Sequence, residues 1–336
     1  MKFIKIGAAL AASLAGLCLA QTPTPQGAAV AAVPQTTWKL ATGYRAESFH
    51  TQNILQFSRD VEQATGGQLT IQVHPNNTLA KLNDIKQAVV DGKAEAGETI
   101  MTSLVKDIPI AGADAVPFVV SSYKDAARLW KLQRPGIEKH LAQRGLTLLY
   151  PVPWPPQGLH SNKPIRGLAD FKGTQMRTYN STTLRIAELL GAKPVDVAMV
   201  DVGKALAEGR MDNMITSALT GVENKVWGSI KYYYEINGWF PKNVVFVNSK
   251  AFAALKPEAR KVVLKAAAEA ETRGWAVSES LATSATNGLR QNGINIDRIP
   301  PDVELEIKRM GEKFSREWVR TVGNEANQNF VPYYLQ

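Results

Sequence analysis

The same order of strand-like and helix-like segments occurs twice along this chain, and that repetition limits the fold more than any single motif does. The first unit contains an amphipathic segment at 47–67, which carries Ile54, Phe57 and Val61 on one helical face and ends at two glycines. Its other parts are strand-like stretches at 37–44, 68–75 and 94–100 and a second helical pattern at 81–92. This alternation indicates an α/β lobe built on a parallel sheet.

The second unit begins after Gly173 and repeats the alternation. Arg177 stands alone near the end of its first strand-like stretch, TQMRTY. The unit continues through a helical pattern at 182–191, an extended stretch at 192–198, a second helical pattern at 201–209 and a strand-like stretch at 210–216. Two similar α/β units predict two lobes with a cleft between them.

Apolar stretches at 145–158 and 243–252 are expected to cross between these lobes. The second crossing precedes a long helical stretch that begins at Pro257 and ends at about Gly293. Segments that cross twice favour a hinged clamshell, with a mixed sheet flanked by helices in each lobe and the long helix running along both. The predicted bounds are 38–154 plus about 243–275 for lobe I and 155–242 plus about 285–336 for lobe II.

The N-terminus has the pattern of a secretory signal peptide. Lys2 and Lys5 precede an apolar run that ends in small residues and is too short for a transmembrane helix. We expect a signal peptide at 1–20, a flexible lead-in at 21–37 and a periplasmic protein; a lipid anchor at Cys18 is the weaker alternative. Without the two lysines the formal charge is 9 − 2 = +7, and its basic residues are scattered, which disfavours nucleic-acid binding.

The sequence contains none of the common catalytic motifs. Nucleophile elbow, P-loop, HExxH and dinucleotide fingerprints are absent, and the four histidines lack metal-ligand spacing. Catalysis therefore has no positive support, and only Glu98 and His160 are candidates for a base in the cleft. Aromatic residues gather instead beside the crossings, with Trp154 in a proline cluster and Trp239 before 243–252. An apolar-walled pocket with a few polar groups is the usual form of a small-molecule site.

A series of loose motifs follows one order through almost all of 38–330. It includes the turn DFKG, the arginine strand, LGAKPV and ALAEGRMD, with VEQATGGQLTIQV upstream and VVFVNSKAF downstream. In this order the chain resembles the substrate-binding proteins of tripartite ATP-independent periplasmic (TRAP) transporters, the DctP-like family. The resemblance implies a periplasmic-binding-protein clamshell that captures a small organic acid and delivers it to TRAP membrane permease subunits, with no catalysis and no cofactor.

The resemblance also implies a role for Arg177, because the arginine of this strand forms a salt bridge with a ligand carboxylate in the family. A planar guanidinium matches a carboxylate through two parallel charge-assisted hydrogen bonds. This chain departs from the family where Thr216 and Ser217 replace a common asparagine, and where Leu159 and His160 replace a second basic residue. A single cation favours a monocarboxylate with a 2-oxo or 2-hydroxy group and an apolar or aromatic tail.

The side chains expected to bind this ligand all stand beside the predicted cleft. They are Tyr44, Glu98, Trp154, Gln157, Arg177, Tyr179, Asn180, Thr216, Ser217 and Trp239. Three alternatives remain open: a C4-dicarboxylate or sugar acid bound by the same fold, an exported enzyme that uses the same cleft, and a sensor module that passes ligand to a receptor.

Overall fold

The computed structural model describes residues 35–335. The predicted signal peptide and the lead-in up to residue 34 lie outside the described residues. Contacts join the described residues in one unit, so the lobe bounds drawn from the sequence stay a prediction. Within the described range, none of the helices combines the length and the apolar composition that a membrane span requires.

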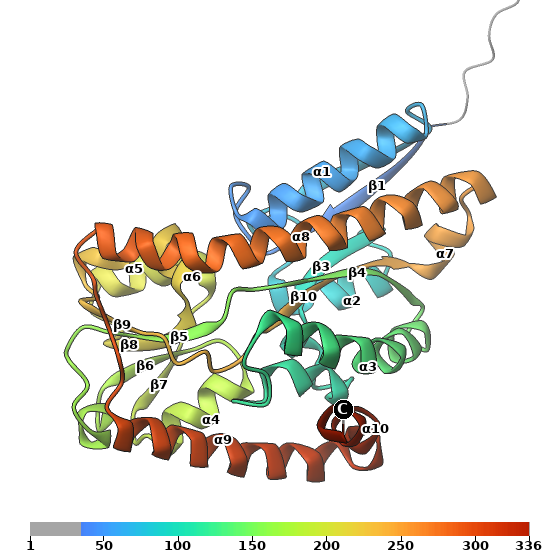
Figure 1. Cartoon of the computed structure of the whole chain (residues 1–336). Coiled ribbons are helices and arrows are strands. Elements are labelled where there is room, and N and C mark those ends of the chain that lie inside the picture. Colours follow the sequence, from blue (N-terminus) through green and yellow to red (C-terminus); the bar gives the residue numbers. More distant parts are fainter. Residues whose placement is uncertain (1–34, 336) are drawn as a thin grey trace, which may run out of the picture. The chain divides into compact units, whose positions relative to one another are not determined.

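A five-stranded mixed sheet forms around the first of the two repeated units (Figure 1). In sheet order its strands are β2 (Leu69–His74), β1 (Thr36–Ala41), β3 (Ala96–Ile100), β10 (Lys242–Asn248) and β4 (Leu146–Pro153). β1 runs parallel to β2 and β3, as the strand–helix–strand pattern predicts, and β10 lies antiparallel between β3 and β4. The sheet is accompanied by α1 (Phe49–Ala64), α2 (Ile85–Val90) and α3 (Tyr123–Ala142).

A six-stranded mixed sheet forms around the second unit. In sheet order its strands are β11 (Asn295–Asp297), β9 (Tyr232–Tyr234), β5 (Gln157–Ser161), β8 (Asn213–Ser217), β6 (Gln175–Thr178) and β7 (Lys193–Asp196). β6 is parallel to β7 and β8, whereas β5 is antiparallel to β8 and β9. Its short helices are α4 (Ser181–Leu189), α5 (Val202–Ala207) and α6 (Ala218–Glu223).

The predicted long helix is α8 (Pro257–Gln291), which follows the short α7 (Ser249–Ala253). It packs on α1 and β4 beside the first sheet and on α6 and β11 beside the second (Figure 1). Glycine is required where α8 meets β4, since a Cβ on Gly274 would lie 2.5 Å from Cγ2 of Val152. Two mixed sheets with flanking helices and one helix along both confirm the predicted fold class.

Two helices go beyond the predicted elements. α3 begins where Ser122 accepts a hydrogen bond from the amide of Asp125, and it tolerates Pro135 in its interior. The tail after β11 contains two helices, α9 (Pro301–Val322) and α10 (Asn324–Leu335). The break between them is Gly323, whose φ of 72° lies in the left-handed region. α10 then packs against α3.

Candidate ligand-binding site

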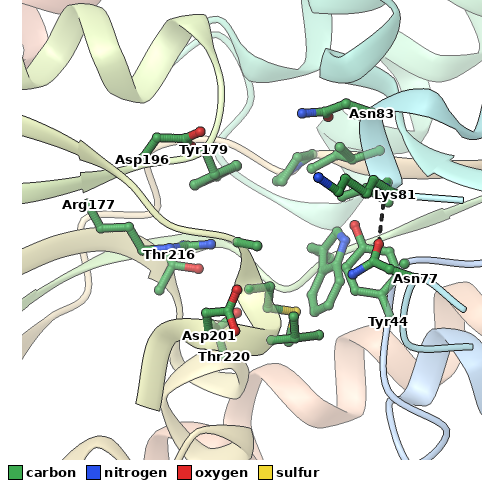
Figure 2. Close-up of a pocket in the computed structure, with 18 of the residues that line it drawn as sticks. Tyr44, Asn77, Lys81, Asn83, Arg177, Tyr179, Asp196, Asp201, Thr216 and Thr220 are labelled. Atoms are coloured by element: carbon green, nitrogen blue, oxygen red, sulfur yellow. Dashed lines mark hydrogen bonds between the residues drawn. The ribbon is translucent and has the colours of Figure 1, made fainter. Parts of the chain in front are cut away.

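A cavity of about 450 Å³ is lined by residues that follow or belong to strands of both sheets (Figure 2). Tyr44 follows β1 and Trp154 follows β4, whereas Gln157, Arg177 and Thr216 lie in strands of the second sheet. Arg177 and Thr216 meet because β6 and β8 run parallel, so their carboxyl ends share one edge, and Gln157 joins them from the amino end of the antiparallel β5. The fold therefore places a pocket at the carboxyl ends of parallel strands, where α/β proteins commonly bind ligands.

Arg177 is the cation on the second-sheet side of this cavity. Its side chain is 3 % exposed, its Nε donates to the carbonyl of Val197 at 2.9 Å, and its guanidinium carbon lies 4.8 Å from the ring centre of Tyr179. Burial lowers the pKa of Arg177 to about 10, while Tyr179 and Asp196 act in the opposite direction. Among the described residues no carboxylate lies within ion-pair distance of Arg177, so the site holds a desolvated cation suited to an incoming anion.

A second cation, Lys81, reaches the cavity from the loop after β2. The expectation of a single cation came from Leu159 and His160, and both are fully buried and absent from the cavity lining. His160 Nε2 lies 3.2 Å from the carbonyl oxygen of Ser217, and burial lowers the pKa of the His160 ring to about 3. The neutral residues after Gly158 therefore do not determine the number of cations in the cavity, because the exposed Lys81 adds a positive charge from the loop after β2.

The aromatic wall of the cavity is held by one buried amide. Asn243 Oδ1 accepts hydrogen bonds from Trp154 Nε1 at 2.9 Å and from the Tyr44 hydroxyl at 3.3 Å, and the two rings lie 5.3 Å apart. On the opposite side, the Tyr179 hydroxyl donates to Gln157 Oε1 at 3.0 Å. The aromatic walls are thus fixed by hydrogen bonds at their polar ends.

Glu98 lies behind this wall rather than in the cavity. Its carboxylate accepts hydrogen bonds from Thr42 Oγ1 at 2.6 Å and from Asn243 Nδ2 at 2.9 Å, and His50 Nδ1 lies 3.4 Å away. Burial raises the pKa of Glu98 to about 7, although both hydrogen bonds oppose the shift, and burial also lowers the pKa of His50 well below its ordinary value. Glu98 is therefore a titratable group that supports the wall through Asn243.

The structure brings together six of the ten residues predicted to bind ligand. The six that line the cavity are Tyr44, Trp154, Gln157, Arg177, Tyr179 and Thr216.

The other four predicted residues have structural roles outside the lining. Asn180 and Ser217 accept hydrogen bonds from backbone amides as the N-caps of α4 and α6. Trp239 is buried in a core cluster of the second sheet, and Glu98 lies behind the wall. Polar side chains can cap helices and aromatic side chains can fill the core, so the residue type alone does not show that a side chain contacts a ligand.

Sequence reasoning missed several lining residues that stand at or beyond the ends of strands. Asn77 and Lys81 follow β2, while Asp196 and Asp201 stand at and after the end of β7 (Figure 2). Only their position in the sequence could have indicated them. Each stands at the carboxyl end of a strand that pairs in parallel with its neighbour, or a few residues beyond it.

Replacing Glu98 with glutamine is expected to remove part of the pH dependence of stability. The folded-state pKa of Glu98 is about 7, above the ordinary value of 4.5. Between these values the carboxyl loses its proton in the unfolded chain but keeps it in the folded protein, so the folded protein loses stability as the pH rises. The free energy of unfolding of the wild type should therefore fall relative to Glu98→Gln by about 2–3 kcal/mol from pH 4.5 to pH 8.

Urea unfolding of both proteins across that pH range measures this difference. Burial also raises the pKa of Glu223 to about 7, but this contribution is common to both proteins and cancels. A stability difference that does not change with pH would show that Glu98 does not titrate in this range.

Comparison with known proteins places these features in one family. The model of the bacterial extracellular solute-binding protein family 7 (DctP) matches residues 40–321. A curated solute-binding protein of Roseobacter denitrificans is 23% identical over 285 residues, which cover 78% of this chain and 86% of that protein.

Solved structures agree with the family match. DctP6, a Bordetella pertussis extracytoplasmic solute receptor binding pyroglutamic acid, is 36% identical with a TM-score of 0.87 and covers 90% of this chain and 100% of its own. A marine metagenome TRAP solute-binding protein specific for pyroglutamate is 33% identical with a TM-score of 0.87 over 90% of this chain and 100% of its own. A Sulfitobacter TRAP protein with bound galacturonate, 16% identical over 88% of this chain and 99% of its own with a TM-score of 0.80, shares the fold.

Proposed function

This chain belongs to the bacterial extracellular solute-binding protein family 7, and on that premise we propose that it is a TRAP-transporter receptor for a small organic acid with one carboxylate, of which pyroglutamate is the first to test. The buried guanidinium of Arg177 carries the proposal, because it lines a cavity and has no carboxylate of the described chain in ion-pair range. Export to the periplasm and delivery to membrane permease subunits belong to the same proposal.

Arg177 is suited to the carboxylate end of such a ligand. Its Nε is already used by the carbonyl of Val197, so the two terminal nitrogens remain the natural donors for a bidentate contact. Burial has removed most of the water around the guanidinium, so a charge pair with a carboxylate is stronger here than at an exposed arginine. Thr216, one strand away and at the same edge, adds a hydroxyl beside this position (Figure 2).

The rest of the cavity offers complementary groups to a ring that contains an amide. A pyroglutamate ring has one N–H donor and one carbonyl acceptor besides its carboxylate. Asp196 and Asp201 supply acceptors for an N–H group, and Asn77 and Lys81 supply donors for a carbonyl oxygen. The apolar edge of the ring would contact Trp154 and the other aromatic side chains of the wall.

The second candidate is a sugar acid or a dicarboxylate, and Lys81 is the observation that favours it. A second cation lowers the cost of bringing a second negative or strongly polar group into the cavity. Against this, Lys81 is exposed, and two aspartates share the cavity with it. Their negative charge disfavours a ligand with two carboxylates.

A competition series tests the ligand class. We expect pyroglutamate to bind more tightly than an aromatic 2-oxo acid, succinate or glucuronate, because it offers one carboxylate, one donor and one acceptor. At a concentration 100 times its dissociation constant it should raise the free energy of unfolding by about 2.7 kcal/mol. Calorimetric titration of each acid and thermal unfolding with and without it provide the measurement.

The same series can contradict the proposal. If succinate or glucuronate binds most tightly, Lys81 acts as a full second cation and the monocarboxylate assignment is wrong. If none of the acids binds, the receptor function itself is in question. Recovery of each acid unchanged after long incubation separates a receptor from an exported enzyme.

A further inference from the structure

Arg45 links the two sides of the cavity through its side chain. It directly follows Tyr44, a cavity residue, in the loop between β1 and α1, and it is partly buried. Its guanidinium donates to three acceptors that follow strands of the second sheet. They are the carbonyl of Val200 at 2.5 Å, Oδ1 of Asn224 at 3.1 Å and the carbonyl of Glu223 at 3.4 Å.

Each acceptor belongs to a segment that shapes the cavity. Val200 lines the cavity together with its neighbours Met199 and Asp201, which form a turn between β7 and α5. Asn224 ends α6 and donates through Nδ2 to the carbonyl of Thr220, itself a lining residue, at 2.9 Å. One side chain from the loop after β1 therefore contacts two separate wall segments beside the second sheet.

The groups around Arg45 accept its hydrogen bonds but do not form an ion pair with it. All three acceptors are neutral groups, and the described ion pairs do not include Arg45. Glu223 interacts electrostatically with both Arg45 and Glu47. Burial raises the pKa of the Glu223 carboxyl, the charge of Arg45 lowers it, and the charge of Glu47 raises it. A guanidinium suits such a site, since its planar fork can serve several acceptors at once.

We propose that Arg45 is a positioning residue that holds the turn at 199–201 and the end of α6 against the Tyr44 loop and so slows ligand release without touching the ligand. The inference rests on the proposed receptor function. Separating the two walls requires these hydrogen bonds to break, so their loss increases the share of open molecules. A smaller share of closed molecules lowers the apparent affinity, because the ligand enters the open form and is retained by the closed form.

The expected change lies in the dissociation rate. Hydrogen bonds from a charged donor are strong enough that Arg45→Ala should raise the dissociation rate of pyroglutamate about ten- to hundredfold. The association rate should change by less than about threefold, since the ligand meets an open cavity in either protein. Arg45→Lys should recover part of the effect, because an ammonium can reach one acceptor but lacks the fork.

Stopped-flow tryptophan fluorescence with pyroglutamate measures both rates. Arg59→Ala is the matched control, because Arg59 is an exposed arginine of α1 whose guanidinium donates to Oε1 of Gln56 in the same helix. Adding Asn224→Ala to Arg45→Ala should cause little further change if the two act as one contact. Unfolding midpoints without ligand show whether a variant has simply lost stability.

Small-angle scattering without ligand tests the same contact independently of the ligand assignment. Arg45→Ala should have a larger radius of gyration than the wild type and the Arg59→Ala control. A wild-type dissociation rate in Arg45→Ala would overturn the positioning role while leaving the receptor function intact. If no acid binds the wild type, the proposed function fails, and equal scattering curves would then overturn the positioning role by themselves.

Discussion

Replacing Arg177 with alanine is expected to abolish detectable binding of pyroglutamate while leaving the fold intact. The ligand carboxylate would lose a buried charge-assisted contact, which costs roughly 2–5 kcal/mol, or about a thirtyfold to several-thousandfold loss of affinity. Without ligand, the Arg177→Ala protein should be at least as stable as the wild type. Arg177 is a cation that is 3 % exposed and forms no ion pair with a described carboxylate, so its removal relieves a desolvation cost.

Calorimetric titration and denaturant unfolding of the same preparation check both parts. Arg177→Lys retains the charge without the fork, and it should also bind poorly. Unchanged affinity in Arg177→Ala would exclude this arginine as the carboxylate partner. A strong loss of stability would instead assign Arg177 a structural role through its hydrogen bond to Val197.

Removing Asp114 is expected to have the largest effect on stability. Asp114 Oδ2 accepts the backbone amide of Lys242 at 2.7 Å and its ammonium at 3.5 Å, and both side chains are fully buried. Burial raises the pKa of Asp114 and lowers that of Lys242, while each partner's charge opposes the other's shift. Asp114→Ala leaves an unpaired buried cation and should lower the free energy of unfolding by about 3–5 kcal/mol.

Urea unfolding measures this loss, and a second substitution tests its cause. Adding Lys242→Met should restore much of the stability, because the pair is then replaced by an apolar side chain of similar length. Asp91→Ala is the control, since the Asp91–Lys93 pair is exposed and should contribute no more than about 1 kcal/mol. If Asp114→Ala costs no more than Asp91→Ala, the buried pair is not an essential link between the short 3-10 helix Pro109–Ala115 and β10.

Local pattern was enough to predict most of the secondary structure. The face predicted for 47–67 places Ile54, Phe57 and Val61 inside, and all three are buried. Helical and strand periodicity report directly on which side of an element meets the core. The break at Gly323 carried a weaker signal, because a glycine within an apolar and charged stretch is compatible with one helix or two.

The site was only partly predictable for the same reason. Arg177 followed from its strand and from the family resemblance, and Trp154 followed from its place beside a crossing. Asn180 and Ser217 show why, because a polar side chain just before a helix can cap that helix or face a ligand, and packing decides which. These two residues bond the backbone of their own helices and do not line the cavity.

The sequence by itself determined the two α/β units and the long helix, because each depends on the periodicity of residues that are near one another in the chain. The order of motifs along the chain indicated the family and the arginine near the end of β6. Only the tertiary structure decided the composition of the cavity. Lys81 and Asp201 are more than 100 residues apart in the chain, and they meet with Asp196 because parallel strands gather their carboxyl ends at one edge of each sheet. The charge balance of the site is therefore a property of the assembled sheets, which no single stretch of sequence contains.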